Sequence, residues 1–240
     1  MLSGKGGTGK TSVCAGLACA LARSGASVLC IDLDVGLRNL DLALGLADVP
    51  ALPFTEVSEG EAELYFAAAH PEFPGLYFFT APVGKNAEEL DADVFREMVD
   101  AAREQYDYVF LDAPAGVGAG FHLAASCASL ELLVTGPEPG ALRDGTRSGE
   151  LLELMGKKDV RLVVNRVDPK LYASMGMTGD DVMDMVGYPL LGLIPEDRNV
   201  TLAAVQGKAL LDYTYRGAAS AMNRIARRLK GESVPLKKLK

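Results

Sequence analysis

Tryptophan is absent from this chain of 240 residues, histidine occurs twice, and there are four cysteines. The cysteines form no C-x-x-C pair, so their spacing predicts neither a zinc site nor an iron–sulfur cluster. Thiols placed in this way are typical of a reduced, cytosolic protein, and we expect all of them to be buried or half-buried. They are Cys14, Cys19, Cys30 and Cys127.

Long apolar runs and a surplus of basic residues are missing too. No apolar run approaches the ~18 residues of a membrane span. Met1 and Leu2 lead into a glycine-rich stretch without a signal-peptide pattern. The formal net charge of −8 argues against a surface that coats nucleic acid, although a local basic patch stays open. No linker or repeat divides the chain, and 49% of its residues are hydrophobic, so we expect one domain over residues 1–240.

Glycine and lysine gather near the amino end, in Gly4-Lys5-Gly6-Gly7-Thr8-Gly9-Lys10-Thr11. The stretch fits G-x-x-x-x-G-K-[ST], a phosphate-binding pattern. Its glycines let the backbone curl so that several N–H groups face one anion. Lys10 brings a charge to the β- and γ-phosphates, and the Thr11 hydroxyl suits Mg²⁺. The alternative is a chance run in a flexible loop, but residues 12–23 follow with helical spacing and would place a helix N-terminus at the anion.

A second lysine, Lys5, lies inside the same loop. Lys10 already serves a nucleotide bound by its own chain. A chemical reason for Lys5 is therefore to reach a phosphate held by another subunit.

Predicted strands alternate with predicted helices along the chain. Alternation of this kind favours right-handed crossovers and a parallel sheet covered on both faces, with ligands outside the carboxyl ends of the strands. We expect strands at Ser27–Asp32, Leu76–Thr80, Tyr108–Leu111, Leu130–Thr135, Arg161–Asn165 and Leu190–Ile194. We expect helices at Ser12–Arg23, Asp91–Gln105, Gly140–Met155, Thr178–Val186 and Arg216–Lys230.

Four stretches together resemble the MinD/ParA ATPases, in the order that the family has them. The glycine-rich loop resembles the deviant Walker A motif, and residues 31–41, Ile-Asp-Leu-Asp-Val-Gly-Leu-Arg-Asn-Leu-Asp, resemble switch I of the MinD branch. Asp112-Ala113-Pro114-Ala115-Gly116 is similar to switch II, and Leu193-Ile194-Pro195-Glu196-Asp197 to the nucleotide-base loop. The resemblance implies a three-layer P-loop α/β fold that binds ATP and Mg²⁺.

The resemblance also implies roles for individual residues. Phosphoryl transfer to water needs a metal, charge stabilisation and a positioned nucleophile. Lys5, Lys10 and Asp34 would act in catalysis, with Asp34 orienting the attacking water. Thr11, Asp112 and Asp32 would support the metal; a cap or turn role for Asp32 stays open. Phosphate contacts would come from Gly4, Lys5, Gly6, Gly7, Thr8, Gly9, Lys10, Thr11 and Ser12.

Base recognition is expected at the far end of the sheet. Asn165 closes a predicted strand and is followed by Arg166, and an amide both donates and accepts, which suits adenine. Pro195 and Asp197 would flank the ring. A turn-capping role for Asn165 is the alternative. For Asp41 and Asp144 we favour ordinary surface charge over a partner contact.

Three stretches depart from the MinD pattern. The strand expected before the P-loop is absent, because Met1, Leu2 and Ser3 alone precede Gly4. The last residues, Pro235–Lys240, are too few to form a stable amphipathic membrane helix. Residues 47–75 are rich in proline and therefore in loops, with a helix expected at Glu59–Ala69.

The expected function is an Mg·ATP-dependent switch that dimerises and hydrolyses ATP slowly. Its expected task is spatial regulation in the cell, and the leading candidate is placement of the division site. A protein activator is expected as partner, and nothing in the sequence favours nucleic acid. The expected localisation is the cytoplasm, with the inner face of the cell membrane as an alternative. Three alternatives remain: a ParA-type ATPase that positions a chromosome, plasmid or flagellum, a metabolic P-loop enzyme, and a truncated module that binds ATP without hydrolysis.

Overall fold

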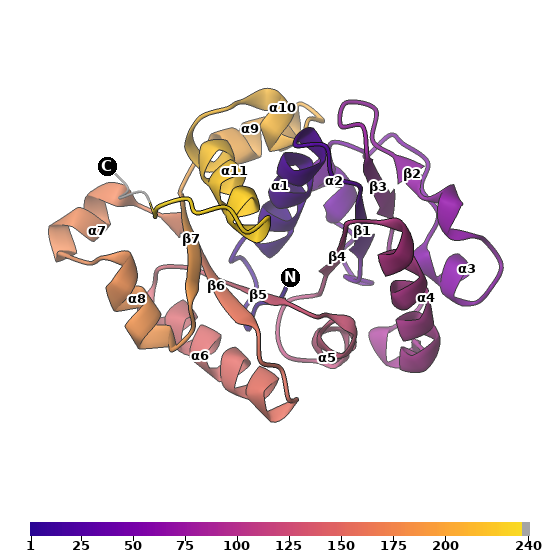
Figure 1. Ribbon diagram of the computed structural model, residues 1–240, viewed down its shortest axis with the longest axis horizontal. Helices are drawn as coiled ribbons and strands as arrows, with labels where there is room; N and C mark the ends of the chain where they lie inside the picture. Colours follow the sequence, from indigo (N-terminus) through magenta and orange to yellow (C-terminus); the bar gives the residue numbers. More distant parts are fainter. Residues whose placement is uncertain (237–240) are drawn as a thin grey trace.

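The computed structural model describes residues 1–236 (Figure 1). Parallel strands form its middle layer, and helices pack on both faces. The strands are β1 (Val28–Asp32), β2 (Ala68–Ala69), β3 (Leu76–Phe79), β4 (Tyr108–Asp112), β5 (Glu131–Thr135), β6 (Val160–Val167) and β7 (Leu190–Pro195). The helices are α1 (Lys10–Arg23), α2 (Leu40–Leu44), α3 (Phe54–Ser58), α4 (Ala92–Gln105), α5 (Ala119–Cys127), α6 (Pro139–Leu154), α7 (Pro169–Met175), α8 (Gly179–Val186), α9 (Asn199–Val205), α10 (Leu210–Tyr213) and α11 (Gly217–Leu229). Short 3₁₀ turns lie at Leu64–Phe66 and Ala87–Glu89.

Alternation along each strand divides the apolar residues between two cores. On β1, Val28 and Cys30 face a core built with α1 and α11, whereas Leu29 and Ile31 face a core built with α4 and α5. All four side chains are fully buried. A strand that is apolar on both faces is what a sheet between two helical layers requires.

The strands form two sheets rather than one continuous sheet. A four-stranded sheet has the order β2-β3-β1-β4, and a three-stranded sheet has the order β5-β6-β7. Every pairing is parallel except that of β2 with β3. The mainly parallel arrangement expected from the sequence is therefore confirmed, but a gap lies between β4 and β5.

Met1, Leu2 and Ser3 lie in this gap. In place of a full strand before the P-loop, they form one β-bridge. Leu2 pairs in parallel with Leu133: it donates to the carbonyl of Leu132 and accepts from the N–H of Val134. Figure 1 marks the amino terminus at this point, between β4 and β5. The three residues deliver the chain directly to the glycine-rich loop.

Most predicted elements agree with the structure to within a few residues, but the helix expected at Glu59–Ala69 is wrong. Gly60 adopts a left-handed φ of 79°, which ends α3 just before this stretch. The stretch then contains a 3₁₀ turn at Leu64–Phe66 and the edge strand β2. Tertiary pairing of β2 with β3 overrides the local helical tendency.

Two further expectations concern the cysteines and membranes. All four cysteines are free thiols and buried, as expected. None of the described helices has the length and apolar character needed to cross a bilayer. The expectation about a membrane helix at Pro235–Lys240 falls mainly on residues 237–240, which lie outside the described part of the chain.

Candidate functional site

The glycine-rich loop turns at the start of α1. Gly7 and Gly9 have left-handed φ angles of 81° and 79°, which side chains other than glycine rarely adopt. A Cβ atom on Gly9 would also lie 2.3 Å from Nδ2 of Asn165. Gly9 offers no side chain to cap α1, so the first N–H groups of the helix stay directed at the space before it. That arrangement suits an anion.

Lys10 and Asp112 form an ion pair at the base of this loop. Nζ of Lys10 donates to Oδ1 of Asp112 at 2.9 Å, and the two residues are 6% and 0% exposed. Within residues 1–236, Oδ2 of Asp112 has no hydrogen-bond partner although it is buried. An unpaired buried carboxylate oxygen is costly, so this atom is poised to accept from a ligand or a water.

Asp32 lies beside Asp112, because β1 and β4 pair in register at these two residues. Its carboxylate accepts from the N–H groups of Asp34 (2.9 Å) and Leu40 (3.2 Å) and so holds the switch I segment in a loop. The pKa of Asp32 is raised to about 7, mainly by burial and in part by the charge of Asp112, against the lowering effect of the two backbone donors. Asp32 therefore has a structural role as the cap of the switch I loop, while its role toward a metal stays a prediction.

Asp34 and its neighbours form the outer part of switch I. The side chain of Asp34 is half-buried, and its Oδ1 accepts from the N–H of Leu37 at 3.3 Å. Arg38 has a left-handed φ of 49°, an uncommon conformation for a side chain of its size, and its Nε donates to Oγ1 of Thr80. Backbone strain of this kind is typical of segments that change shape with a ligand.

Lys5 and Lys10 differ sharply in their surroundings. Lys5 is exposed and Lys10 is buried, although both belong to the same loop. Ser3 donates its hydroxyl proton to the carbonyl of Lys5 at 3.2 Å, so the backbone of Lys5 is fixed while its side chain is in solvent.

Asn165 and Arg166 contact the P-loop from the end of β6. Nδ2 of Asn165 donates to the carbonyl of Thr8 at 2.8 Å, and Asn165 is 6% exposed. Arg166 has a left-handed φ of 61°, donates from Nε to Glu196 at 2.8 Å and from a terminal nitrogen to the carbonyl of Gly7 at 3.1 Å. Both residues thus position the phosphate-binding loop; adenine contact by Asn165 stays a prediction.

Asp197 caps two helices rather than presenting a free carboxylate. One oxygen accepts from the N–H of Asn199 at the start of α9, and the other from the N–H of Ala218 in the first turn of α11, both at 2.9 Å. Pro195 ends β7 opposite Val167. The loop is therefore anchored to α9 and α11 through Asp197, and contact of Pro195 and Asp197 with an adenine ring stays a prediction.

Thr11 and Ser12 lie half-buried in the first turn of α1. The carboxylate of Asp41 accepts from the N–H of Leu42 at 2.7 Å, and among the described residues neither Asp41 nor Asp144 bonds to the glycine-rich loop through its carboxylate. The structure therefore joins Lys10 to Asp112, places Asp32 in register beside Asp112 and holds Asp34 at Asp32. Thr11 follows Lys10 in the first turn of α1. Sequence reasoning missed Thr80 and Glu196, the partners of Arg38 and Arg166. Glu196 had a signal, since it lies inside the quoted base-loop motif.

The residues at this edge fit a magnesium ion that takes most of its ligands from phosphates and water. Asp112 offers a buried, unpartnered carboxylate oxygen, and Thr11 offers a hydroxyl at the helix start. Across residues 1–236 there is no group of three His, Cys, Asp or Glu side chains that could hold a metal by itself. The donor set is thus of the kind that completes an ion brought in with a nucleotide.

The fold and this loop define a P-loop nucleotide-binding protein of the three-layer α/β class. Comparison with known families is consistent with that class. The model of the CobQ/CobB/MinD/ParA nucleotide binding domain matches residues 1–211. The chain belongs to this family.

Individual relatives point to one branch of the family. The septum site-determining protein MinD of Synechocystis sp. is 35% identical over 236 residues, which cover 97% of this chain and 89% of that protein. The MinD chain in the MinC:MinD cell division protein complex of Aquifex aeolicus superposes with a TM-score of 0.90 at 33% identity, covering 98% and 96% of the two chains. MinD of Pyrococcus horikoshii, complexed with Mg-ADP, gives a TM-score of 0.80 at 30% identity, covering 95% and 93%.

Proposed function

We propose that this chain is an ATP-hydrolysing switch that dimerises with Mg·ATP and regulates placement of the division site. The relatives named as septum site-determining proteins match almost the whole chain, and a similar structure holds Mg-ADP. The proposal takes residues 1–240 as one ATPase domain. It assigns the chain to the timed, regulatory ATPases rather than to metabolic enzymes.

Nucleotide binding would change the ion pair between Lys10 and Asp112. In the structure Nζ of Lys10 is bonded to Asp112. A β- or γ-phosphate in the P-loop would compete for this ammonium group, because phosphate carries more charge than one carboxylate. Asp112 would then have two acceptor oxygens for the water shell of Mg²⁺, and the ion would supply neutralisation of the charge on the transferred phosphoryl group. Thr11 would hold the same ion directly.

Asp34 would orient the attacking water, and Asp32 would fix the loop that carries Asp34. The N–H of Asp34 is already held by Asp32 at 2.9 Å. Orienting a water at the end of such a braced segment is a positioning effect, in which small displacements cost much of the rate. The glycine-rich backbone from Gly4 to Gly9 and Ser12 would complete the phosphate contacts, while Asn165 and the loop of Pro195 and Asp197 would flank the base.

The exposure of Lys5 is the observation that best supports the proposed dimeric switch. Lys10 is 6% exposed and already occupied within its own chain, while the Lys5 side chain is free in solvent. A second positive charge at the mouth of a phosphate site gains most when water is excluded from it. A partner subunit closing over the loop excludes that water, so each Lys5 would act on the nucleotide of the other chain.

Partners and localisation follow from the same proposal. The Aquifex relative is seen in a complex with MinC, and we propose that a protein effector likewise recognises the ATP-bound dimer of this chain. The proposed place of action is the cytoplasm and, for the dimer, the inner face of the cell membrane. Nucleic acid is not part of the proposal, since the net charge is −8.

Mixing two inactive variants tests the dimeric switch. Lys5→Ala and Lys10→Ala chains together form a heterodimer in which one site keeps both lysines and the other keeps neither. Equal mixing makes half of the dimers heterodimers with one complete site each, so ATPase activity should return to about a quarter of the parental rate. Steady-state phosphate release measures it.

The matched control replaces the second chain by the Lys5→Ala/Lys10→Ala double variant. Its heterodimers with Lys5→Ala contain no complete site, so no activity should return. Absence of recovery in the first mixture, with heterodimer detected by differential tagging, would contradict the assignment of Lys5 to the other subunit.

A further inference from the structure

Tyr65 and Phe66 form an exposed aromatic pair outside the nucleotide site. Tyr65 is 66% exposed and Phe66 is 50% exposed, and their ring centroids lie 4.2 Å apart with the ring planes tilted by 33°. The pair lies in the 3₁₀ turn between α3 and the edge strand β2. Figure 1 shows α3 and β2 at the outer edge of the four-stranded sheet, at the opposite end of the molecule from α7 and α8. We call the two residues the Tyr65–Phe66 patch.

The backbone of the turn fixes the outward direction of both rings. Side chains three residues apart lie on the same face of a 3₁₀ helix, and here Leu64 and Ala67 are both buried. The N–H of Ala67 donates to the carbonyl of Leu64 at 3.2 Å, and the N–H of Phe66 donates to the carbonyl of Glu63 at 3.1 Å. The rings between the two buried residues are therefore held at the surface. Such a fixed presentation lowers the ordering cost that binding of a partner has to offset.

Acidic residues precede this patch, and no basic residue accompanies them. Residues 39–84 contain neither lysine nor arginine. Glu63 begins the turn of the patch, and both Glu61 and Glu63 are exposed. Glu59 is bonded to Lys85, but neither Glu61 nor Glu63 belongs to an ion pair within residues 1–236. The aromatic surface therefore has unpaired negative charge beside it.

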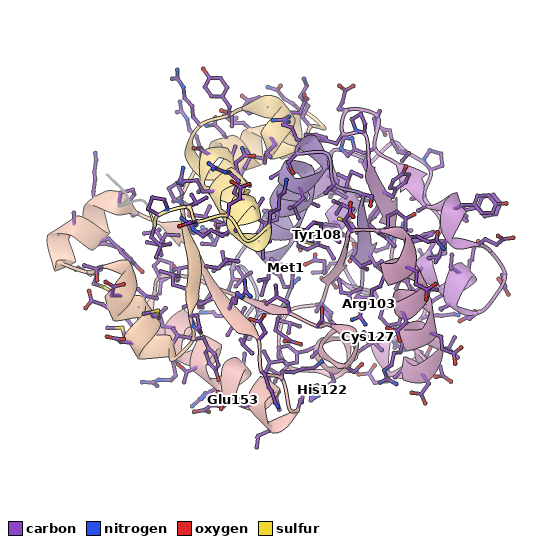
Figure 2. All side chains as sticks on the ribbon, in the orientation of Figure 1. Met1, Arg103, Tyr108, His122, Cys127 and Glu153 are labelled. Atoms are coloured by element: carbon purple, nitrogen blue, oxygen red, sulfur yellow. The ribbon has the colours of Figure 1, made fainter. Side chains whose placement is uncertain are left out.

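The arginines of the neighbouring helix α4 are engaged elsewhere. Aromatic side chains of α3 and α4 pack edge to face, so α4 is the helix beneath this part of the surface. Arg96 pairs with Asp93, and Arg103 pairs with Asp100, in each case on α4 itself. Arg103 also donates to the carbonyl of Cys127, beside which it lies in Figure 2. The cations of α4 therefore do not serve the carboxylates next to the patch.

A second exposed tyrosine shows what the patch lacks. Tyr215 is 73% exposed, and Cζ of Arg216 lies 5.3 Å from the centroid of its ring. Among the described residues, no cation lies over the ring of Tyr65 or Phe66. A guanidinium or ammonium group within about 6 Å of a ring centroid is attracted to the face of the ring. The patch thus offers ring faces and carboxylates to cations of another molecule.

We propose that the Tyr65–Phe66 patch, together with Glu61 and Glu63, is a docking surface for an arginine-rich segment of a partner protein. Arginine suits this surface better than lysine, because a planar guanidinium stacks on aromatic rings and donates to a carboxylate through two N–H groups. The unpaired glutamates repel an anionic membrane and nucleic acid. The net charge of −8 likewise disfavours a second copy of this chain as the occupant.

Binding of a defined peptide tests this docking surface on the protein of 240 residues, without nucleotide. The probe is fluorescently labelled Arg-Leu-Arg-Leu-Arg-Leu, and the control peptides carry lysine or glutamate in place of arginine. Fluorescence anisotropy should show the tightest binding for the arginine peptide and none for the glutamate peptide. Tyr65→Ala/Phe66→Ala should weaken binding of the arginine peptide by about 5- to 30-fold, because two cation–π contacts are lost. Glu61→Gln/Glu63→Gln should weaken it by about 3- to 10-fold and reduce its dependence on salt.

Tyr215→Ala is the matched control, since it removes an equally exposed ring that already has a cation of its own. Its affinity for the arginine peptide should equal that of the parent. Peptide binding should also shift the amide NMR signals of residues 61–67. All these variants change exposed side chains, so their melting temperatures should stay within about 2 °C of the parent. The Glu61→Gln/Glu63→Gln variant keeps the test decisive if the alanine variant does not fold.

Equal affinity of the parent and of Tyr65→Ala/Phe66→Ala for the arginine peptide would overturn the docking surface, and so would NMR shifts confined to other residues. Loss of binding to phosphatidylglycerol vesicles in the alanine variant would assign the patch to a membrane instead. Loss of self-association in sedimentation would assign it to a second copy of the chain. Because these measurements need neither ATP nor its hydrolysis, their outcome is separate from that of the proposed function.

Discussion

The inner and the outer parts of the nucleotide site differ in how they hold charge. In the inner part, Lys10, Asp32 and Asp112 are at most 6% exposed and are bonded to one another or to backbone N–H groups. In the outer part, Lys5 is exposed and Asp34 is half-buried. The inner charges are held by partners in the same chain, apart from one oxygen of Asp112, whereas the outer charges are partly or fully solvated.

This difference assigns the two parts to different steps. When a phosphate arrives, Lys10 must exchange Asp112 for the ligand, so substitutions in the inner part should affect nucleotide binding. The interaction of a solvated charge with a phosphate becomes stronger when a second surface excludes water. Substitutions in the outer part should therefore affect the steps that depend on the dimer. Substitutions in the two parts should therefore separate binding, hydrolysis and assembly.

The largest effect is expected for Lys10→Ala. Loss of the ammonium group removes stabilisation of the phosphates in the transition state, and turnover should fall by about 100- to 1000-fold. Stability should fall too, because the carboxylate of Asp112 is left buried and unpaired, at a cost of about 3–5 kcal/mol. Phosphate release and thermal melting measure the two effects.

The control for this variant is the Lys10→Ala/Asp112→Asn double variant. It removes the unpaired charge, so melting should recover while turnover stays lost. Turnover of Lys10→Ala within a factor of about two of the parent would reject Lys10 as the phosphate-binding lysine.

The next effect is expected for Asp34→Ala, which probes the outer part. Turnover should fall by about 100-fold because the water loses its orienting group, while ATP binding persists. Dimer should accumulate, since closure is no longer reversed by hydrolysis; light scattering with Mg·ATP detects it. Asp48→Ala, an exposed aspartate of the same charge outside the site, should behave as the parent. A strictly monomeric Asp34→Ala protein with ATP bound would contradict the sandwich dimer.

A smaller effect concerns pH and Asp32. The pKa of its carboxyl is about 7 in the folded protein against 3.8 unfolded, so the folded state binds more protons between these values. Stability should therefore decrease as pH rises through this window, and Asp32→Asn should lack that decrease. From about pH 5 to about pH 7 the parent should lose about 2 kcal/mol relative to Asp32→Asn. Urea unfolding at several pH values measures it; parallel pH profiles of the two proteins would refute it.

The smallest effect is expected for Glu196→Gln. Arg166 and Glu196 form an ion pair at 2.8 Å, but their side chains are 54% and 52% exposed. Solvent screens such a pair, so unfolding free energy should change by less than about 1 kcal/mol. A loss as large as that of Lys10→Ala would show that this exposed ion pair contributes as much to stability as the buried pair of Lys10 and Asp112.

Local sequence patterns predicted much of this molecule because its signals are short-range. The apolar run of β1 and the helical spacing of residues 12–23 need no distant partner to be recognised, and both elements are found within two residues of their predicted limits. The glycines of the P-loop are fixed by local backbone geometry, as their left-handed φ angles show. Short helices such as α2 and α10 lack such a signal, because packing alone stabilises them.

The sequence by itself therefore determined the family, the alternating order of the elements and the loop that binds phosphate. Tertiary structure decided what depends on residues far apart in the chain. It placed Asn165 and Arg166 against the P-loop carbonyls and paired Lys10 with Asp112. It also left β4 and β5 unpaired with each other, with Leu2 paired to β5 and Met1 bonded to β4. Pairings of this kind depend on burial and on hydrogen bonds that close only when distant strands meet, and no local pattern encodes them.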